Sequence, residues 1–283
     1  MSTPATEELI YSLTNILSNH KYLLQSPTWD QSSTSYSAQK RLKLLSLLSV
    51  LLVTESSNDV VAISLRITSR DSIEISYAKN RPCTLIEKEY VNKLFEIACD
   101  RLLSSPARRY SLLSLVVIQC KKKVISCLQN ITTRLRQLDP KLDQAFLKVV
   151  YYKDEIRNQS LAQCAEEIRV LLSCTSLPPD SSLTDMLKLW FQRLLDHFQP
   201  GIPFDMDSED HTVLVLEAVN IGHYLTRGAR IAPILEQNLL GHVEKLGDYY
   251  IAVDMLEKEV SKLTVSQLSS LIIREVILLP LNI

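Results

Sequence analysis

The sequence predicts a mostly α-helical protein, a helical bundle of about ten helices with one small N-terminal β-hairpin. Three observations support this fold class. Only 5 of the 283 residues are glycine, which favours long helices joined by short connections. Apolar residues recur at helical spacing along most of the chain. One stretch near 59–78 instead alternates apolar and polar residues, which is the pattern of paired strands.

Helices are expected wherever apolar residues recur at intervals of three and four. In chain order these segments are 9–24, 38–54, 85–102, 107–138, 141–174 (with a break expected near 158–160), 182–198, 208–226, 229–247, 248–263 and 265–278. Proline helps to define the boundaries, since Pro140 is expected to start a helix and Pro200 and Pro203 follow the end of another.

The predicted hairpin lies between the second and third helices. Val61, Ile63 and Leu65 alternate with small or polar residues, and so do Ile73 and Ile75. Each strand should have one wet face, and the apolar face must pack on the flanking helices, because an isolated hairpin is only marginally stable.

The helices are expected to form two lobes, an N-terminal lobe of residues 1–176 and a C-terminal lobe of residues 180–283. The segment around Pro178 and Pro179 is the predicted linker. Residues 1–140 hold 18 Lys and Arg against 12 Asp and Glu, whereas residues 141–283 hold 13 against 20. Either these halves attract each other or the basic half contacts an acidic partner.

Composition places the chain among globular proteins inside the cell. The apolar fraction of 46% is ordinary for a folded domain. The N-terminus lacks a basic and apolar leader pattern, so a cytoplasmic or nuclear location is expected. The longest apolar stretch, 42–53, is shorter than the roughly 20 residues of a membrane span, so no membrane helix is expected. The six cysteines should be reduced, buried thiols.

Motifs for phosphate binding and nucleophilic catalysis do not occur in the sequence. There is no G-x-G-x-x-G, G-x-x-x-x-G-K-[ST] or G-x-S-x-G string. His242 and Glu244 have the H-x-E form of zinc deaminases, but no cysteine follows Cys174 to complete a zinc site. We therefore predict no catalytic, cofactor-binding or metal-binding residue.

Other arrangements are better explained as core or surface. His197 follows Arg193 at a spacing shorter than that of helical ribonucleases. Cys120 and Cys127 are two helical turns apart, about 10 Å, which is too far to share one ion without other ligands. Trp190 is expected to anchor the core.

Lys121, Lys122 and Lys123 form the strongest basic cluster of the sequence. Consecutive lysines point in different directions around a helix, so a solvated helix face is the favoured interpretation. Binding to nucleic acid is the alternative, but a sequence pI near 6.5 argues against a dedicated nucleic-acid module. We list these lysines as candidate interaction residues.

The stretch 44–80 resembles the front part of a set of uncharacterised fungal proteins. The matching pieces are Val60–Ile63, which resembles their "VVAV" strand, and Ala78–Asn80, and the resemblance is faint from there to Lys262. In that family a helical region precedes a C-terminal deaminase-like domain with H-A-E and C-x-x-C motifs. This sequence ends without those motifs, so the resemblance implies a stand-alone or truncated helical portion, and no catalytic residue is carried over.

The C-terminal stripe is the second candidate interaction surface, represented by Leu271, Ile272 and Ile277. The predicted function is that of a non-catalytic intracellular interaction or scaffold protein with no cofactor and a protein partner of unknown identity. An accessory or truncated part of a deaminase-like fungal protein is the alternative, and a helical enzyme with an unfamiliar site stays open. Neither a membrane nor nucleic acid is the expected partner, and the sequence does not give the oligomeric state.

Overall fold

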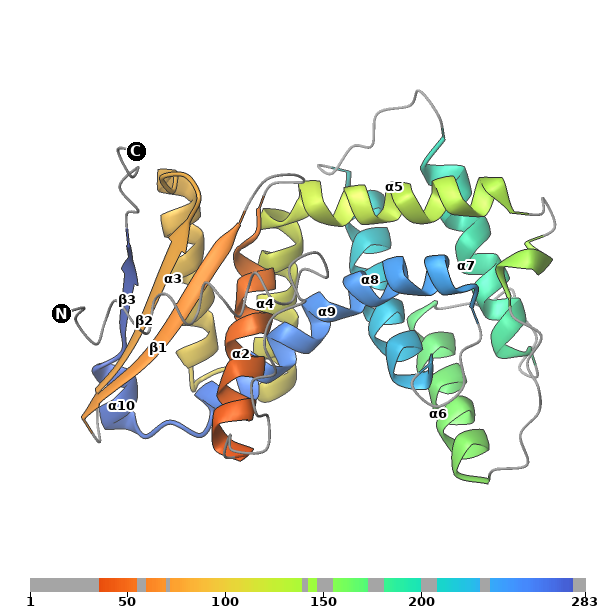
Figure 1. Cartoon of the computed structure of the whole chain (residues 1–283). Coiled ribbons are helices and arrows are strands. Elements are labelled where there is room, and N and C mark those ends of the chain that lie inside the picture. Colours follow the sequence, from red (N-terminus) through yellow and green to blue (C-terminus); the bar gives the residue numbers. More distant parts are fainter. Residues whose placement is uncertain are drawn as a thin grey trace, which may run out of the picture. The chain divides into compact units, whose positions relative to one another are not determined.

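The computed structural model describes residues 36–54, 60–69, 72–138, 142–146, 155–172, 181–199, 208–229 and 235–276. These residues are mostly helical and carry one small sheet built on an N-terminal β-hairpin (Figure 1). The predicted fold class is therefore confirmed. The predicted helix 9–24, the linker at Pro178 and Pro179 and the helix start at Pro140 lie outside the described residues.

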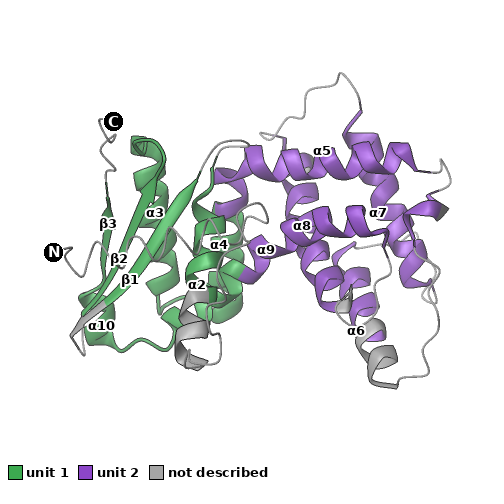
Figure 2. Ribbon diagram, viewed as in Figure 1, with its two compact units in different colours: residues 1–115, 252–283 green, residues 116–251 purple. Residues whose placement is uncertain are grey.

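The chain forms two compact units (Figure 2). Unit 1 consists of residues 1–115 and 252–283, and unit 2 consists of residues 116–251. The bounds differ from those of the lobes expected from the sequence, 1–176 and 180–283. The end of the chain belongs to the same unit as its beginning, because the C-terminal strand pairs with the N-terminal hairpin.

Unit 1 contains a three-stranded sheet in the order β1-β2-β3. β1 (Val61–Ser69) and β2 (Ser72–Lys79) form the predicted antiparallel hairpin, and Ile63 pairs with Tyr77. β3 (Ile272–Glu275) runs parallel to β2, and its last residue, Glu275, pairs with Tyr77 of β2. The sheet thus joins residues that are about two hundred positions apart in the sequence.

One face of this sheet packs against α2 (Tyr36–Leu52) and α3 (Leu85–Cys99). The alternation of the strands puts Ile63, Ile75 and Tyr77 on this face, where 3–8% of each residue is exposed. The opposite face carries Ser64 paired with Ser76 and Arg66 paired with Glu74, as the predicted wet face requires.

The helical part of unit 1 continues with α4 (Ser105–Gln119), of which residues 105–115 belong to the unit. Arg108 is only 8% exposed, and its guanidinium has three acceptors. It donates to the carbonyl of Asp100 (2.8 Å), the carbonyl of Leu103 (3.0 Å) and the carboxylate of Glu257 (3.0 Å). Arg108 therefore holds the α3–α4 turn and the last turns of α9 (Gln237–Val260) together.

The predicted long helix 107–138 is two helices, which corrects the sequence-based expectation. α4 ends at Gln119, Cys120 adopts φ −90° and ψ 14°, and α5 (Lys121–Gln137) follows directly. Neither glycine nor proline marks the break. Cys120 is fully buried, so tertiary packing rather than local propensity ends α4 there.

The described residues of unit 2 are mostly helical. After a short 3₁₀ turn, Asp143–Ala145, its elements are α6 (Glu155–Leu171), α7 (Leu183–His197), α8 (Glu209–Ala229) and α9 (Gln237–Val260), of which residues 252–260 belong to unit 1. The prediction of separate helices over 229–247 and 248–263 is wrong, because α9 runs through Gly247 without interruption.

Gly247 allows close contact between α8 and α9 and does not end a helix. A Cβ atom added at Gly247 would lie 2.7 Å from the carbonyl oxygen of Gly222, and one at Gly222 would lie 2.8 Å from the nitrogen of Gly247. The backbones of α8 and α9 therefore approach each other at two glycines. Any side chain at either position must push the helices apart.

The predicted helix 265–278 is also wrong beyond its first turns. α10 (Val265–Ser269) begins at the Thr264 capping box, but residues 272–275 form β3. Ile272 and Ile273 are β-branched, and the open edge of β2 offers their backbone a ladder of hydrogen bonds. Helical periodicity alone did not contain this information.

We predict that Gly222→Ala lowers the free energy of unfolding by about 1–3 kcal/mol, since overpacking against backbone forces the helices to shift. Gly241→Ala in α9 is the matched control, because a Cβ at Gly241 has no neighbour within 4 Å. That control should stabilise the protein by up to about 1 kcal/mol through helix propensity. Urea denaturation followed by circular dichroism measures both. Equal effects of the two substitutions would contradict the close approach of α8 and α9.

Candidate interaction surface

The carboxylate of Glu87 is the centre of a buried polar cluster in unit 1. It accepts hydrogen bonds from Lys79 Nζ (2.6 Å), from the Arg81 guanidinium (2.7 and 2.8 Å) and from Thr54 Oγ1 (2.6 Å). It also accepts the backbone N–H of Thr84 (2.8 Å), which completes a capping box at the start of α3. Both Lys79 and Glu87 are 5% exposed.

This cluster determines the charge state of Glu87. Burial by itself raises the pKa of the carboxyl, but the hydrogen bonds from Arg81, Lys79, Thr54 and Thr84 outweigh burial and hold the pKa well below its usual range. Glu87 is therefore ionised and paired in the folded protein. It connects the end of β2, the first turn of α3 and Thr54 in the loop after α2.

Glu275, at the end of β3, attaches the third strand to α3. Its carboxylate accepts the backbone N–H of Cys83 (3.0 Å) and forms an ion pair with Lys88 Nζ (2.8 Å). The hydrogen bond from Lys88 is the main reason that the pKa of Glu275 is lowered. On the opposite face of the sheet Arg274 forms an ion pair with Glu74 (3.3 Å).

The groups covered near this strand are protonated at neutral pH. Burial, together with the neighbouring Glu275, raises the pKa of Cys83 to about 11. Burial likewise raises the pKa of Tyr77 to about 12. A thiol with a pKa this high is a poor nucleophile, so Cys83 is a buried core residue in this state of the protein.

Exposed aliphatic side chains lie around β3 and the first turn of α3. Leu85 is 71% exposed and Ile86 is 66% exposed, and Ile272 on β3 is 38% exposed. The capping box of Thr84 and Glu87 fixes where α3 begins, and the two residues between them point to solvent. Lys88, one turn from Leu85, contacts Glu275 at the end of β3. Ile272 pairs with Glu74 at the start of β3 and lies on the face of the sheet that α3 does not cover.

We call the surface formed by Leu85 and Ile86, beside the Lys88–Glu275 ion pair that joins α3 to β3, the α3–β3 surface. Ile272, one of the residues that the sequence proposed for interaction, is outside this surface, on the other face of the sheet. Leu271 precedes the strand and is half-buried, and Ile277 lies outside the described residues. Leu85 and Ile86 were not expected from the sequence, because helical periodicity assigned Leu85 to the buried stripe.

The other predicted interaction residues belong to unit 2. Lys121, Lys122 and Lys123 form the first turn of α5, not the middle of a long helix. Lys122 is exposed, and Lys121 and Lys123 are half-buried. These three cations lie at the N-terminus of α5, where positive charge is unfavourable because that end of the helix dipole is itself positive. The sequence did not indicate this, because it did not predict the break at Cys120.

The unequal charges of the two halves of the sequence do not carry over to the compact units. Unit 1 holds 16 Lys and Arg against 15 Asp and Glu, and unit 2 holds 15 against 17. Five cations of the N-terminal half, Lys121, Lys122, Lys123, Arg134 and Arg136, belong to unit 2, and residues 252–283 bring 3 Lys and Arg and 4 Asp and Glu to unit 1. Attraction between oppositely charged halves is therefore not a property of these units.

Histidines singled out from the sequence are distributed over unit 2. His242 is half-buried on α9, and burial, followed by the nearby Lys245, lowers its pKa. His197 contacts the edge of His211, with ring centroids 5.3 Å apart. Among the residues that the structure describes, no group of three His, Cys, Asp or Glu side chains is placed to hold a metal ion.

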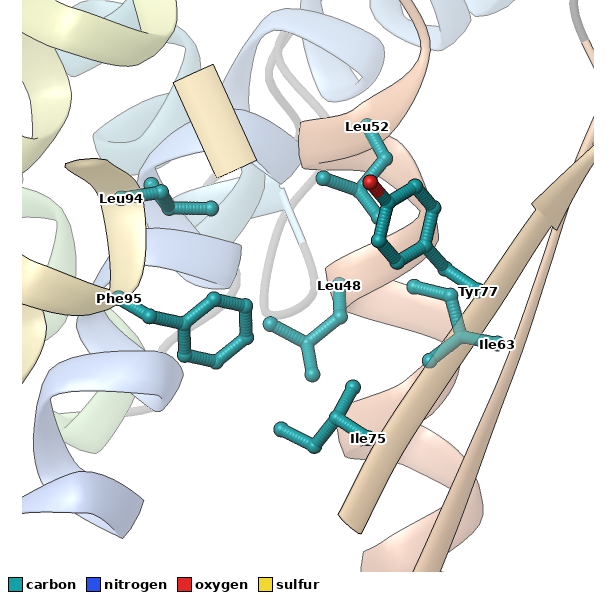
Figure 3. A pocket seen from close by; sticks show the side chains of 7 residues that line it. All are labelled: Leu48, Leu52, Ile63, Ile75, Tyr77, Leu94 and Phe95. Atoms are coloured by element: carbon teal, nitrogen blue, oxygen red, sulfur yellow. The ribbon is translucent and has the colours of Figure 1, made fainter. Parts of the chain in front are cut away.

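The apolar groups singled out from the sequence lie in the core, as predicted. Trp190 and Cys120 are fully buried, and Cys127 is 5% exposed. A cavity of about 10 Å³ lies between the sheet and its helices in unit 1 and is lined only by apolar residues and Tyr77 (Figure 3). It has room for about one water molecule, so this cavity is a packing gap and not a ligand site.

No protein-family model matches the chain, and neither a curated protein nor a solved structure matches it. The fungal resemblance and the deaminase-linked alternative thus stay predictions from the sequence. Within the described part of the chain, no helix combines the length and the apolar content needed to cross a membrane.

We predict that acid destabilises unit 1 through Glu87. The pKa of Glu87 in the folded chain lies below its ordinary value of 4.5, so folding favours the ionised carboxylate. Its stabilisation is complete above the pKa of the unfolded chain and is lost as the pH falls through that value toward the folded pKa. Glu87→Gln should lower the free energy of unfolding at neutral pH by roughly 3–5 kcal/mol, because it leaves Lys79 buried without its charge partner.

Urea denaturation at several pH values between neutrality and acid tests this prediction. The Glu87→Gln protein should lose less stability than the parent as the pH falls. Glu89→Gln, at an exposed position two residues away, is the matched control and should follow the parent at every pH. A parent and a Glu87→Gln protein with parallel pH profiles would show that the Glu87 cluster does not carry the acid sensitivity.

Proposed function

We propose that the protein is a non-catalytic interaction or scaffold protein that binds a protein partner through the α3–β3 surface. The observation that carries the proposal is the exposure of Leu85 and Ile86, two neighbouring aliphatic side chains at the start of α3. Single exposed aliphatic residues are ordinary, but neighbouring exposed ones mark interaction sites more often than other surfaces do.

The setting of these side chains supports a binding role. Leu85 and Ile86 belong to the first turn of a helix whose start is fixed by the buried Glu87 cluster. A rigid support lowers the conformational entropy that is lost when a partner binds. A charged residue borders the aliphatic ones, since the side chain of Lys88, one turn from Leu85, is 46% exposed. An apolar centre with a polar rim is the usual anatomy of a protein interface.

Partner binding is tested with the paired substitution Leu85→Lys and Ile86→Lys. Both residues are exposed, so the change should leave the free energy of unfolding within about 0.5 kcal/mol of the parent. The parent protein is first used to capture a partner stoichiometrically from cell extract, and binding is repeated with the purified partner. We expect the paired variant to bind that partner at least about tenfold more weakly than the parent does. Isothermal titration with the purified partner measures the loss.

Val213→Lys is the matched control, because Val213 is an aliphatic residue of α8 in unit 2 that is 53% exposed. The control protein should bind the partner as tightly as the parent. Equal affinity of the paired variant and the parent would exclude the α3–β3 surface. Failure of the parent to retain any purified partner would contradict the interaction function itself.

A further inference from the structure

Residues 265–276, which form α10 and β3, are attached to unit 1 differently from the rest of the sheet. None of these residues, all of which the structure describes, is buried. β2, against which they lie, is buried at most positions, and Ile75, Tyr77 and the nearby Cys83 are 5–9% exposed. The segment thus covers core residues without contributing a core side chain of its own.

The described contacts of this segment with the rest of unit 1 include a short backbone ladder, two ion pairs and the hydrogen bond from Cys83 N–H to Glu275. Four residues of β3 pair with β2, and Val276 donates its N–H to the carbonyl of Tyr77 (2.8 Å). Glu275 pairs with Lys88 and Arg274 pairs with Glu74, and one partner of each pair is about half or more exposed. Exposed ion pairs contribute little to stability and are screened by salt.

The segment also has a defined base. The Arg101 guanidinium donates to the carbonyl of Leu263, and the Thr264 side chain accepts the N–H of Gln267 (3.2 Å) to start α10. Residues beyond this base can leave the sheet while α9 and the β1–β2 hairpin keep their packing.

We infer that residues 265–276 form a latch that opens from the edge of β2 as one unit while the rest of unit 1 stays folded. Local opening of this kind is expected where a segment has few buried apolar contacts and many exposed hydrogen bonds. The closed latch covers the polar backbone edge of β2 and so protects it from pairing with strands of other chains. This inference goes beyond the proposed function and does not depend on it.

Neighbouring amides of β2 distinguish opening of the latch from opening of the hairpin. In a parallel ladder, alternate residues of a strand bond to a given neighbour. The register and the Val276–Tyr77 bond direct the N–H groups of Ile75 and Tyr77 toward β3. The hydrogen bond from Asn80 N–H to the Val60 carbonyl (3.2 Å) agrees with this alternation, because it directs the N–H groups of Ser76 and Ala78 toward β1.

Hydrogen exchange of the full chain, read residue by residue by NMR, tests the latch. After correction for intrinsic rates, the amides of Ile75 and Tyr77 should exchange at least about tenfold faster than those of Ser76 and Ala78. Added salt should widen this ratio, because it screens the two ion pairs. Equal protection of all four amides would overturn the inference, since the strand would then open only with the hairpin.

Glu275→Ala provides the second measurement. It removes the ion pair to Lys88 and the acceptor of the Cys83 N–H, so the exchange of Ile75 and Tyr77 should accelerate while that of Ser76 and Ala78 stays unchanged. Alkylation of Cys83 by iodoacetamide, followed by mass spectrometry, should accelerate in the same variant. The control is Glu259→Ala, which removes an ion pair with Lys262 before the latch begins. Acceleration of all four amides together would show global destabilisation and would also overturn the latch.

The exchange experiment and the partner experiment fail independently. If the latch opens as expected but no partner binds, only the proposed interaction function is contradicted. If a partner binds through Leu85 and Ile86 but hydrogen exchange is uniform along β2, only the latch is contradicted.

Discussion

The ionised carboxylate of Glu87 is the group on which the arrangement of unit 1 depends. Bringing Lys79 and Glu87 out of water carries a large desolvation penalty, which is offset only when every lone pair and proton of the buried charges finds a partner. Arg81, Thr54 and the backbone of Thr84 supply those partners at 2.6–2.8 Å. Because the donors come from the loop after α2, the end of β2 and the start of α3, the three elements must meet in one geometry.

From that junction the rest of unit 1 follows in order. The start of α3 is fixed, so Tyr90 reaches the carbonyl of Leu51 at 2.7 Å and Lys88 meets Glu275. Glu275 then places β3 beside β2. The exposed side chains of Leu85 and Ile86 and the weakly held latch are therefore consequences of where a single capping glutamate lies. The start of α3, which carries the proposed interaction surface, is fixed by the same cluster.

Unit 2 is held by a different kind of constraint. Its helices α8 and α9 approach to backbone contact at Gly222 and Gly247, and the rings of Trp190, Phe191 and Phe146 pack at centroid distances of 5.1 and 5.9 Å. Dispersion and the exclusion of water from such close contacts supply the stabilisation. A partly buried ion pair between Arg193 and Glu217 (2.9 Å) joins α7 to α8 at the edge of this packing.

Local patterns determined the elements of this protein. Alternation over Val61–Tyr77 predicted the hairpin, and apolar spacing predicted most helices, because side-chain direction along a strand or helix is fixed by backbone geometry alone.

The same rules predicted a continuous helix through Cys120 and a helix boundary at Gly247. Both expectations are wrong, since a buried thiol and a glycine are used for contacts between helices that no local window contains. Residues 272–275 were predicted as helix for the same reason. The side chains of Ile272 and Ile273 fit either structure, and only pairing with the edge of β2, some two hundred residues earlier, decides for a strand. The Thr84–Glu87 spacing was visible in the sequence, but Lys79, Arg81 and Glu275 became its neighbours only through tertiary folding, because pairing of buried charges depends on distances in space and not along the chain.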